Sequence, residues 1–173
     1  MTNMIKNFIY CPRCKGLLKR IDGRLIDCPK CHFHFYLAPA QTTALIMENS
    51  KRQILLTKRK FAPKKNYWDL PGGFINFKET AEESLRREIK EELNITLKQL
   101  TYFGSYWSYY PYKKIRYQTL CLAFTSHYDG QKISVNDDVK DYRFFSYKQI
   151  SLDKISFVDI KTALKDYLKR VSS

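Results

Sequence analysis

The sequence predicts an α+β protein in two parts, a small β-hairpin unit over residues 1–38 and a mixed-sheet domain over residues 39–173. Three observations lead to this prediction. Several short runs have the β-branched, aromatic or alternating character of strands, two segments have helical periodicity, and four of the five cysteines lie before residue 38. A chain of 173 residues has room for one ordinary domain and a small appendage.

The N-terminal part is organised around two Cys-x-x-Cys pairs, with thirteen residues between the pairs. Four thiolates at this spacing suit a tetrahedral Zn²⁺ ion, so we expect a structural zinc ribbon. Disulfides are disfavoured by the expected cytosolic context, and redox chemistry is disfavoured by the paired arrangement. The predicted zinc ligands are Cys11, Cys14, Cys28 and Cys31.

The segment between the cysteine pairs predicts a β-hairpin, because Asp22-Gly23 is a strong turn dipeptide. A unit this short has little hydrophobic core, and a bound metal explains how it could fold. His32 and His34 are further donors nearby. Because four thiolates already fill a structural zinc site, we interpret both histidines as surface or packing residues.

The larger part contains five predicted strands and two predicted helices. A polar turn at residues 48–51 joins the first two strands, and Asp129-Gly130 predicts a later hairpin turn. Cys121 falls within a strand, where it is expected to be a small buried hydrophobic residue. The expected strands cover residues 42–47, 53–58, 100–106, 116–126 and 142–147, and the expected helices cover residues 80–93 and 157–170.

The first predicted helix carries Glu88, Glu91 and Glu92 at the i, i+3, i+4 spacing, which places them on one face. They border an apolar stripe that includes Leu85 and Ile89, so the carboxylates lie beside the buried face of the helix. Carboxylates this close repel one another unless cations neutralise them, which indicates a seat for a hard divalent metal. A solvated surface helix with Glu–Arg pairs is the alternative.

The stretch from Gly73 to Ile95 resembles the signature of the Nudix hydrolases. One position departs from the pattern, because Asn94 stands where the family has Gly. Asn is the next best residue for the left-handed conformation that ends a helix, so the resemblance holds. The matching residues are Gly73, Glu79, Arg87, Glu88, Ile89, Glu91, Glu92, Leu93 and Ile95, preceded by a Trp68-x-Leu70-Pro71-Gly72 lead-in that family members share.

The resemblance implies an α/β/α sandwich around a mixed sheet, from about residue 41 to the C-terminus. It also implies a hydrolase that cleaves the pyrophosphate bond of a nucleoside diphosphate linked to another group, with Mg²⁺ or Mn²⁺ held by the three glutamates.

Arg87 is expected to pair with Glu79 and fix the loop against the helix. An additional acid from a later loop is expected, with Asp138 the first candidate and Asp141 the second. Substrate contacts are expected at Gly72, Gly73 and Arg59.

A zinc ribbon before a Nudix domain is similar to the arrangement in the bacterial NADH pyrophosphatases. Residues 105–111 keep the first Ser, the aromatic character and the final Pro of a signature in those proteins. Trp107 and Tyr109 are therefore candidates for stacking on a nucleobase, with ordinary sheet positions as the alternative. The expected substrates are ADP-ribose, NADH, NAD⁺ or a related compound. Alternatives are removal of NAD-type caps from RNA and a non-catalytic nucleotide- or RNA-binding module.

The formal net charge is +14, from 31 Lys and Arg against 17 Asp and Glu, which indicates an anionic partner such as a nucleotide or RNA. Lysines scattered for solubility are the alternative. The sequence contains no run of eighteen apolar residues that would predict a membrane span. Residues 1–10 lack a signal-peptide pattern. We therefore expect a cytoplasmic protein without membrane contact, and the zinc-ribbon relatives suggest a homodimer.

Overall fold

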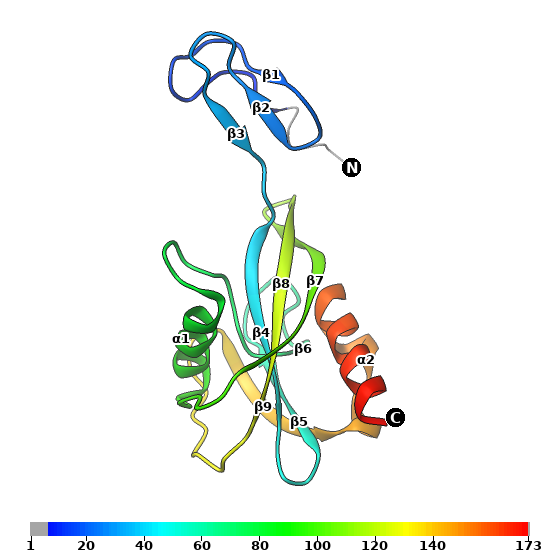
Figure 1. The fold of residues 1–173 in the computed structure, drawn as a ribbon. Coiled ribbons are helices and arrows are strands. Elements are labelled where there is room, and N and C mark those ends of the chain that lie inside the picture. Colours follow the sequence, from blue (N-terminus) through cyan, green and yellow to red (C-terminus); the bar gives the residue numbers. More distant parts are fainter. Residues whose placement is uncertain (1–6, 173) are drawn as a thin grey trace. The chain divides into compact units, whose positions relative to one another are not determined.

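The computed structural model describes residues 7–172, so the first six residues of the predicted N-terminal domain and residue 173 lie outside the described range. The chain divides into two compact units, with the division between Pro39 and Ala40 (Figure 1). Each unit has its own sheet and its own buried residues.

The smaller unit is a three-stranded antiparallel sheet in the order β1-β2-β3, formed by β1 (Lys19–Arg20), β2 (Leu25–Asp27) and β3 (His34–Tyr36). Asp22 makes the turn between β1 and β2, because its Oδ1 accepts hydrogen bonds from the backbone N–H groups of Arg24 and Leu25 at 2.7 and 2.8 Å. The core of this unit is small, with Ile26 fully buried. The predicted turn is confirmed.

The larger unit has a mixed sheet in the order β6-β5-β4-β8-β7, with β9 also paired to β5. β4 and β8 run parallel, whereas β7 is antiparallel to β8 and β9 is antiparallel to β5. Short 3₁₀ turns η2 (Tyr147–Gln149) and η3 (Leu152–Lys154) lead into the last helix. The remaining elements are β4 (Ala40–Glu48), β5 (Gln53–Arg59), β6 (Trp68–Asp69), α1 (Ala81–Leu93), β7 (Thr101–Tyr112), β8 (Ile115–His127), β9 (Val139–Ser146) and α2 (Val158–Ser172).

Helices α1 and α2 cover opposite faces of this sheet (Figure 1). Side chains alternate across a strand, and β4 shows the result: Ala44 and Ile46 belong to the core that α2 covers, while Leu45 and Met47 belong to the core that α1 covers. Each fully buried Leu or Ile contributes roughly 1.5–3 kcal/mol. Two cores on the two faces make the α/β/α sandwich, which confirms the predicted fold class.

Two turns differ from the sequence prediction. β7 continues through the aromatic run to Tyr112, and the two-residue turn at Lys113 and Lys114 has positive φ angles of 45° and 69°, as hairpin turns of this length require. The prediction of a hairpin turn at Asp129-Gly130 is wrong. These residues lie in the loop between β8 and β9, and β9 pairs with β5 on another part of the sheet.

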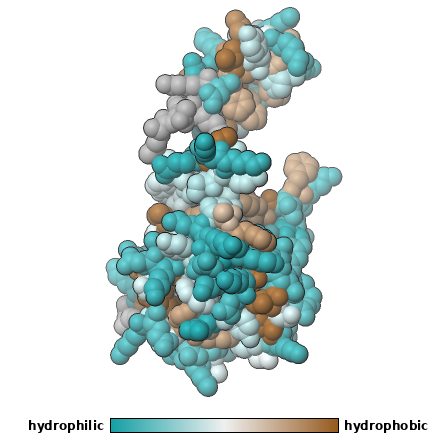
Figure 2. Space-filling model, turned by 180° about the vertical axis from the view of Figure 1, so that it is seen from behind, coloured by the Kyte–Doolittle hydropathy of each residue, from teal (hydrophilic) through white to brown (hydrophobic). Residues whose placement is uncertain are grey.

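The face of the larger unit shown in Figure 2 is mainly hydrophilic, with isolated hydrophobic side chains between polar ones. Isolated exposed hydrophobic residues are ordinary on protein surfaces. Within residues 7–172, no helix combines the length and the apolar character needed to cross a membrane.

Candidate active site and metal centre

Helix α1 has both ends defined by its own sequence. Thr80 is the N-cap, and a capping box joins it to Glu83. Asn94 is the C-cap in the left-handed conformation, with φ 55° and ψ 31°, and its N–H donates to the carbonyl of Lys90. The interpretation of Asn94 as a substitute for Gly is confirmed, and both ends of the acidic helix are fixed.

The loop before α1 needs both of its glycines. Gly72 has φ +138°, and a Cβ there would lie 2.3 Å from the carbonyl oxygen of Thr43. A Cβ on Gly73 would lie 2.5 Å from the carboxylate of Glu88. The loop is held to β4, because the N–H of Thr43 donates to the Gly73 carbonyl at 2.8 Å. The backbone therefore passes directly against the acidic face of α1.

Alanine at the two glycines is expected to have different effects. Gly72→Ala should lower the free energy of unfolding by about 2–4 kcal/mol, because it combines a strained φ with a clash against backbone. Gly73→Ala should keep most of the stability and lose divalent-metal affinity, because the new methyl group displaces the mobile end of Glu88. Denaturant unfolding and metal titration measure the two effects.

Gly130→Ala is the matched control, because Gly130 has φ +87° but open space around it. It should show the cost of the dihedral angle alone, about 1 kcal/mol. If Gly72→Ala proved no less stable than Gly130→Ala, the close approach of the loop to β4 would not constrain the site.

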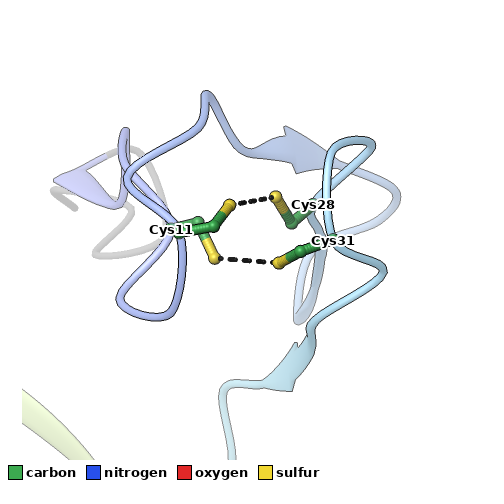
Figure 3. A group of neighbouring side chains, drawn as sticks. Cys11, Cys28 and Cys31 are labelled. Atoms are coloured by element: carbon green, nitrogen blue, oxygen red, sulfur yellow. Dashed lines mark hydrogen bonds between the residues drawn. The ribbon is translucent and has the colours of Figure 1, made fainter.

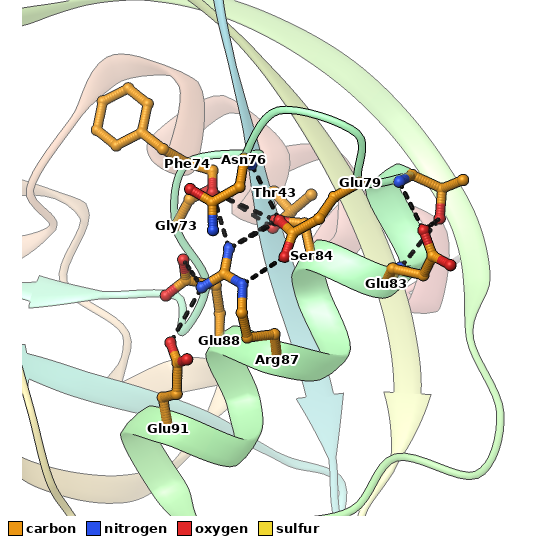
Figure 4. A network of polar contacts seen from close by, with 11 residues as sticks. Thr43, Gly73, Phe74, Asn76, Glu79, Glu83, Ser84, Arg87, Glu88 and Glu91 are labelled. Atoms are coloured by element: carbon orange, nitrogen blue, oxygen red, sulfur yellow. Dashed lines mark hydrogen bonds and ion pairs between the residues drawn. The ribbon is translucent and has the colours of Figure 1, made fainter.

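Arg87 connects the loop to the acidic face (Figure 4). Its guanidinium makes a two-pronged ion pair with Glu79, at 2.7 and 3.0 Å, and also contacts Glu88 at 2.7 Å and Glu91 at 3.0 Å. It donates to the carbonyl of Phe74 at 3.1 Å. The bonds from Arg87 hold the pKa of Glu79 at about 2, well below its usual range. The predicted Glu79–Arg87 pair is present.

The three glutamates of the predicted metal seat differ in burial. Glu92 is 7 % exposed, and its Oε2 accepts the N–H of Gly72 at 3.1 Å. Burial raises the pKa of Glu92 well above its usual range, and the neighbouring carboxylate of Glu88 adds to this effect. Burial also raises the pKa of Glu88. The side chain of Glu91 is 47 % exposed. The site therefore contains one buried and one partly buried carboxylate, Glu92 and Glu88, that are costly to ionise without a cation.

These carboxylates open onto a cleft of about 300 Å³, which is also lined by Gly72, Gly73 and Asp138. The Asp138 backbone is held by Lys60, whose N–H donates to its carbonyl at 2.9 Å. The structure therefore brings the first candidate acid to the cleft. Asp141, the second candidate, lies in β9 opposite Lys58, is exposed and does not line the cleft.

The other predicted substrate residues are Arg59, Trp107 and Tyr109, and they lie in different places relative to the cleft. Arg59 lines the cleft, but its guanidinium is paired with Asp69 at 3.0 Å and lies over the ring of Phe157 at 5.1 Å. Trp107 is 63 % exposed and lines neither the cleft nor the smaller aromatic recess beside it, so its contact with a nucleobase stays a prediction. Tyr109 lines the recess.

The recess beside the cleft is lined by aromatic rings and adjoins the cleft, because Arg59, the two glycines and several other residues line both. The ring of Tyr110 lies 5.4 Å from that of Phe74 and 5.5 Å from that of Phe157. Sequence reasoning missed these rings and two buried acids, Asp69 and Asp159. Alternation along β7 was the one available signal, since it places Ser108 and Tyr110 on one face and Trp107 on the other.

A divalent cation fits the donor set of the cleft. Hard cations take carboxylate oxygens, and burial raises the pKa values of Glu88 and Glu92, so a cation in the cleft would offset the cost of ionising them. Glu88, Glu91, Glu92 and Asp138 are the residues that could hold it.

The four cysteines of the smaller unit form a second candidate metal centre (Figure 3). Their sulfur atoms all lie within 4.8 Å of one another, with Cys11 to Cys31 at 3.7 Å and Cys14 to Cys28 at 3.5 Å. Tetrahedral zinc with bonds of about 2.3 Å separates its sulfurs by roughly 3.8 Å. The geometry therefore fits a Cys₄ zinc site.

The two cysteine pairs have the same local backbone. The residue after each pair, Lys15 and His32, has a positive φ of 62° and 56°, and its N–H donates back to the carbonyl of the first cysteine. His32 therefore completes a turn, while His34 pairs with Asp27 at 2.9 Å. Neither histidine belongs to the cysteine cluster, in agreement with the sequence interpretation.

Comparison with known proteins agrees with this geometry. The family model described as NUDIX domain matches residues 38–165, which is more than half of the chain. The chain belongs to the NUDIX domain family. A NUDIX hydrolase from Nitrosomonas europaea has a similar structure, with a TM-score of 0.68 and 27 % identity over 93 % of this chain and 90 % of that one.

Two curated Nudix relatives have named activities. An ADP-ribose pyrophosphatase of Methanocaldococcus jannaschii is 36 % identical over 137 residues, covering 79 % of this chain and 78 % of that protein. An NAD-capped RNA hydrolase, NudC, of Haemophilus influenzae is 26 % identical over 154 residues, covering 86 % of this chain and 55 % of NudC. This chain thus spans about half the length of NudC. Family membership and these relatives show that the chain is a Nudix pyrophosphohydrolase.

Proposed function

We propose that this Nudix protein uses a divalent metal to cleave the pyrophosphate bond of a nucleoside diphosphate linked to another group, with ADP-ribose and NADH as leading substrates. One observation carries the proposal: the carboxylates of α1, the Gly72-Gly73 backbone and Asp138 line a single cleft that adjoins an aromatic recess. The named activity of the M. jannaschii relative supports ADP-ribose.

The residues of the cleft would share the work. Glu88, Glu91, Glu92 and Asp138 would hold Mg²⁺ or Mn²⁺, which when bound neutralises phosphate charge and lowers the pKa of bound water. Arg87 would act as a positioning residue, because its bonds to Glu79 and Glu88 fix the loop against the helix. The reaction adds water across one P–O bond of the pyrophosphate and yields two phosphate monoesters.

The pH dependence of metal binding follows from the buried carboxylates. Because burial raises the pKa values of Glu88 and Glu92, protons compete with the metal to higher pH than at an exposed site. Mn²⁺ affinity should therefore rise as pH increases from about 5.5 to about 8. Metal titrations at several pH values, followed by thermal shift, check this. Equal affinity at both ends of the range would contradict it.

A panel of substrates tests the proposed function. Purified protein with Mg²⁺ or Mn²⁺ would be offered ADP-ribose, NADH, NAD⁺, diadenosine polyphosphates, nucleotide sugars and nucleoside triphosphates, with products identified by mass spectrometry. Cleavage at the pyrophosphate bond of ADP-ribose or a dinucleotide supports the proposal. Hydrolysis of nucleoside triphosphates alone would overturn it.

Removal of NAD-type caps from RNA is the second candidate, favoured by the net charge of +14 and by the named activity of the NudC relative. The salt dependence of turnover distinguishes the two candidate functions. Turnover of capped RNA that depends on contacts with many phosphates should fall steeply as salt increases, whereas turnover of a free dinucleotide should change much less.

We also propose a cytoplasmic location, because four unbridged cysteines placed where they could hold zinc suit a reducing compartment. The homodimer stays a prediction, which light scattering on the purified protein checks.

A further inference from the structure

The recess beside the cleft has a buried carboxylate in its wall. Asp159 lies in the first turn of α2, is 7 % exposed, and lines the recess together with Phe74, Tyr110 and Phe157. The recess adjoins the metal cleft, because Phe74 and Tyr110 line both. A group held at Asp159 would therefore lie beside a pyrophosphate held in the cleft, where one ligand could supply both.

The two buried acids of the recess have different partners. Asp69 is paired with the guanidinium of Arg59 at 3.0 Å. Asp159 has neutral donors instead, the backbone N–H of Ile160 at 3.0 Å and the hydroxyl of Ser108. The backbone N–H of Asp159 itself is a third neutral donor. An ionised carboxylate accepts about four hydrogen bonds, so three donors still leave acceptor capacity. Burial raises the pKa of Asp159, which agrees with incomplete compensation of its charge.

The size and lining of the recess select the shape of the ligand. Its volume is about 80 Å³, smaller than the roughly 150 Å³ that holds a benzene ring. Because the recess is small but not enclosed, it admits the edge of a planar ring rather than a whole nucleoside. Aromatic rings on its walls favour a flat, polarisable group such as a nucleobase.

We propose that Asp159 is a specificity-determining residue that accepts a hydrogen bond from the exocyclic amine of a purine base bound in the aromatic recess. This inference rests on the proposed function, since it concerns the base of the same substrate. An amino group offers N–H donors to the carboxylate, whereas an oxo group at the same position presents an acceptor that the carboxylate repels. The site should therefore prefer amino purines to hypoxanthine.

Binding of mononucleotides tests the proposal without requiring turnover. Calorimetric titrations would compare AMP, GMP and IMP, which differ only in the amino and oxo groups of the base. We expect AMP or GMP to bind about 10- to 100-fold more tightly than IMP, as for hydrogen bonds to a charged group. In Asp159→Asn this preference should disappear, because the amide can donate as well as accept.

Asp153→Asn is the matched control, since Asp153 is an exposed aspartate in η3, close to Asp159 in the chain. It should keep the wild-type preference. If Asp159→Asn fails to fold, N6,N6-dimethyl-AMP on the wild-type protein replaces it, because this base has no amine protons and should bind as weakly as IMP.

The outcomes separate this inference from the proposed function. Equal affinities for all three nucleotides, no binding of any of them, or a preference that persists in Asp159→Asn would each overturn the role of Asp159. A preference that depends on Asp159 in a protein that cleaves no nucleoside diphosphate derivative would support that role and overturn the proposed function.

Discussion

Replacing Glu92 with Gln is expected to lower the rate of pyrophosphate hydrolysis by about 10³-fold, at saturating substrate and metal. The amide keeps the shape of the side chain and can still accept the N–H of Gly72, which Glu92 accepts at 3.1 Å. It removes the negative charge that the proposed metal site needs. The measurement is the initial rate of ADP-ribose hydrolysis with Mn²⁺, for the wild type and the variant.

The stability of Glu92→Gln gives a second readout with a definite sign. Burial raises the pKa of Glu92 in the folded protein above its value in the unfolded chain. The free energy of unfolding therefore decreases as pH rises from the unfolded pKa toward the higher folded pKa. Without metal, the variant should therefore be at least as stable as the wild type at neutral pH. With Mn²⁺, the wild type should gain stability and the variant should gain less.

Glu82→Gln is the matched control, because Glu82 is exposed on the same helix. It should turn over substrate at the wild-type rate. Turnover close to wild type by Glu92→Gln would contradict the assignment of the cleft, whatever the metal content.

Loss of zinc is expected to unfold the smaller unit and to leave the larger one folded. The smaller unit buries few apolar side chains, whereas structural zinc in small domains contributes apparent free energies of roughly 10–16 kcal/mol. The larger unit has two cores of its own. Hydrogen exchange after Cys28→Ser should show loss of protection over residues 7–39 and retention over residues 40–172.

Elemental analysis of the wild type should find about one zinc per chain. Cys121→Ala is the control, because Cys121 is buried in the larger unit and distant in sequence from the four-cysteine cluster, and it should retain the metal. A zinc-free protein whose smaller unit is still protected from exchange would contradict the zinc-ribbon assignment.

The local features of the fold could be predicted from the sequence because neighbouring residues determine them. Asp22 makes its turn with residues two and three positions away, and Asn94 ends α1 by bonding to Lys90. The pairing of Glu79 with Arg87 spans the N-cap residue and the first two turns of α1. The family resemblance supplied the order of layers, which periodicity alone would have left as α+β.

The features that the sequence missed depend on contacts between distant segments. β9 pairs with β5, more than eighty residues earlier, and no local signal distinguishes this partner from β8. The aromatic recess brings together Tyr110 of β7 and two residues outside the helices and strands, Phe74 and Phe157, from distant parts of the chain. Trp107 was a candidate because its segment resembles a signature of the NADH pyrophosphatases, with an ordinary sheet position as the alternative. The sequence alone did not show on which face of β7 it lies, since that depends on register.

Product analysis of ADP-ribose hydrolysis tests the central claim most directly. Wild-type protein with Mn²⁺ should convert ADP-ribose and water to AMP and ribose 5-phosphate, and a chelator that removes Mn²⁺ or the Glu92→Gln substitution should prevent this. Release of inorganic phosphate or of free ADP in place of AMP, or the same products at the same rate without divalent metal, would contradict the account.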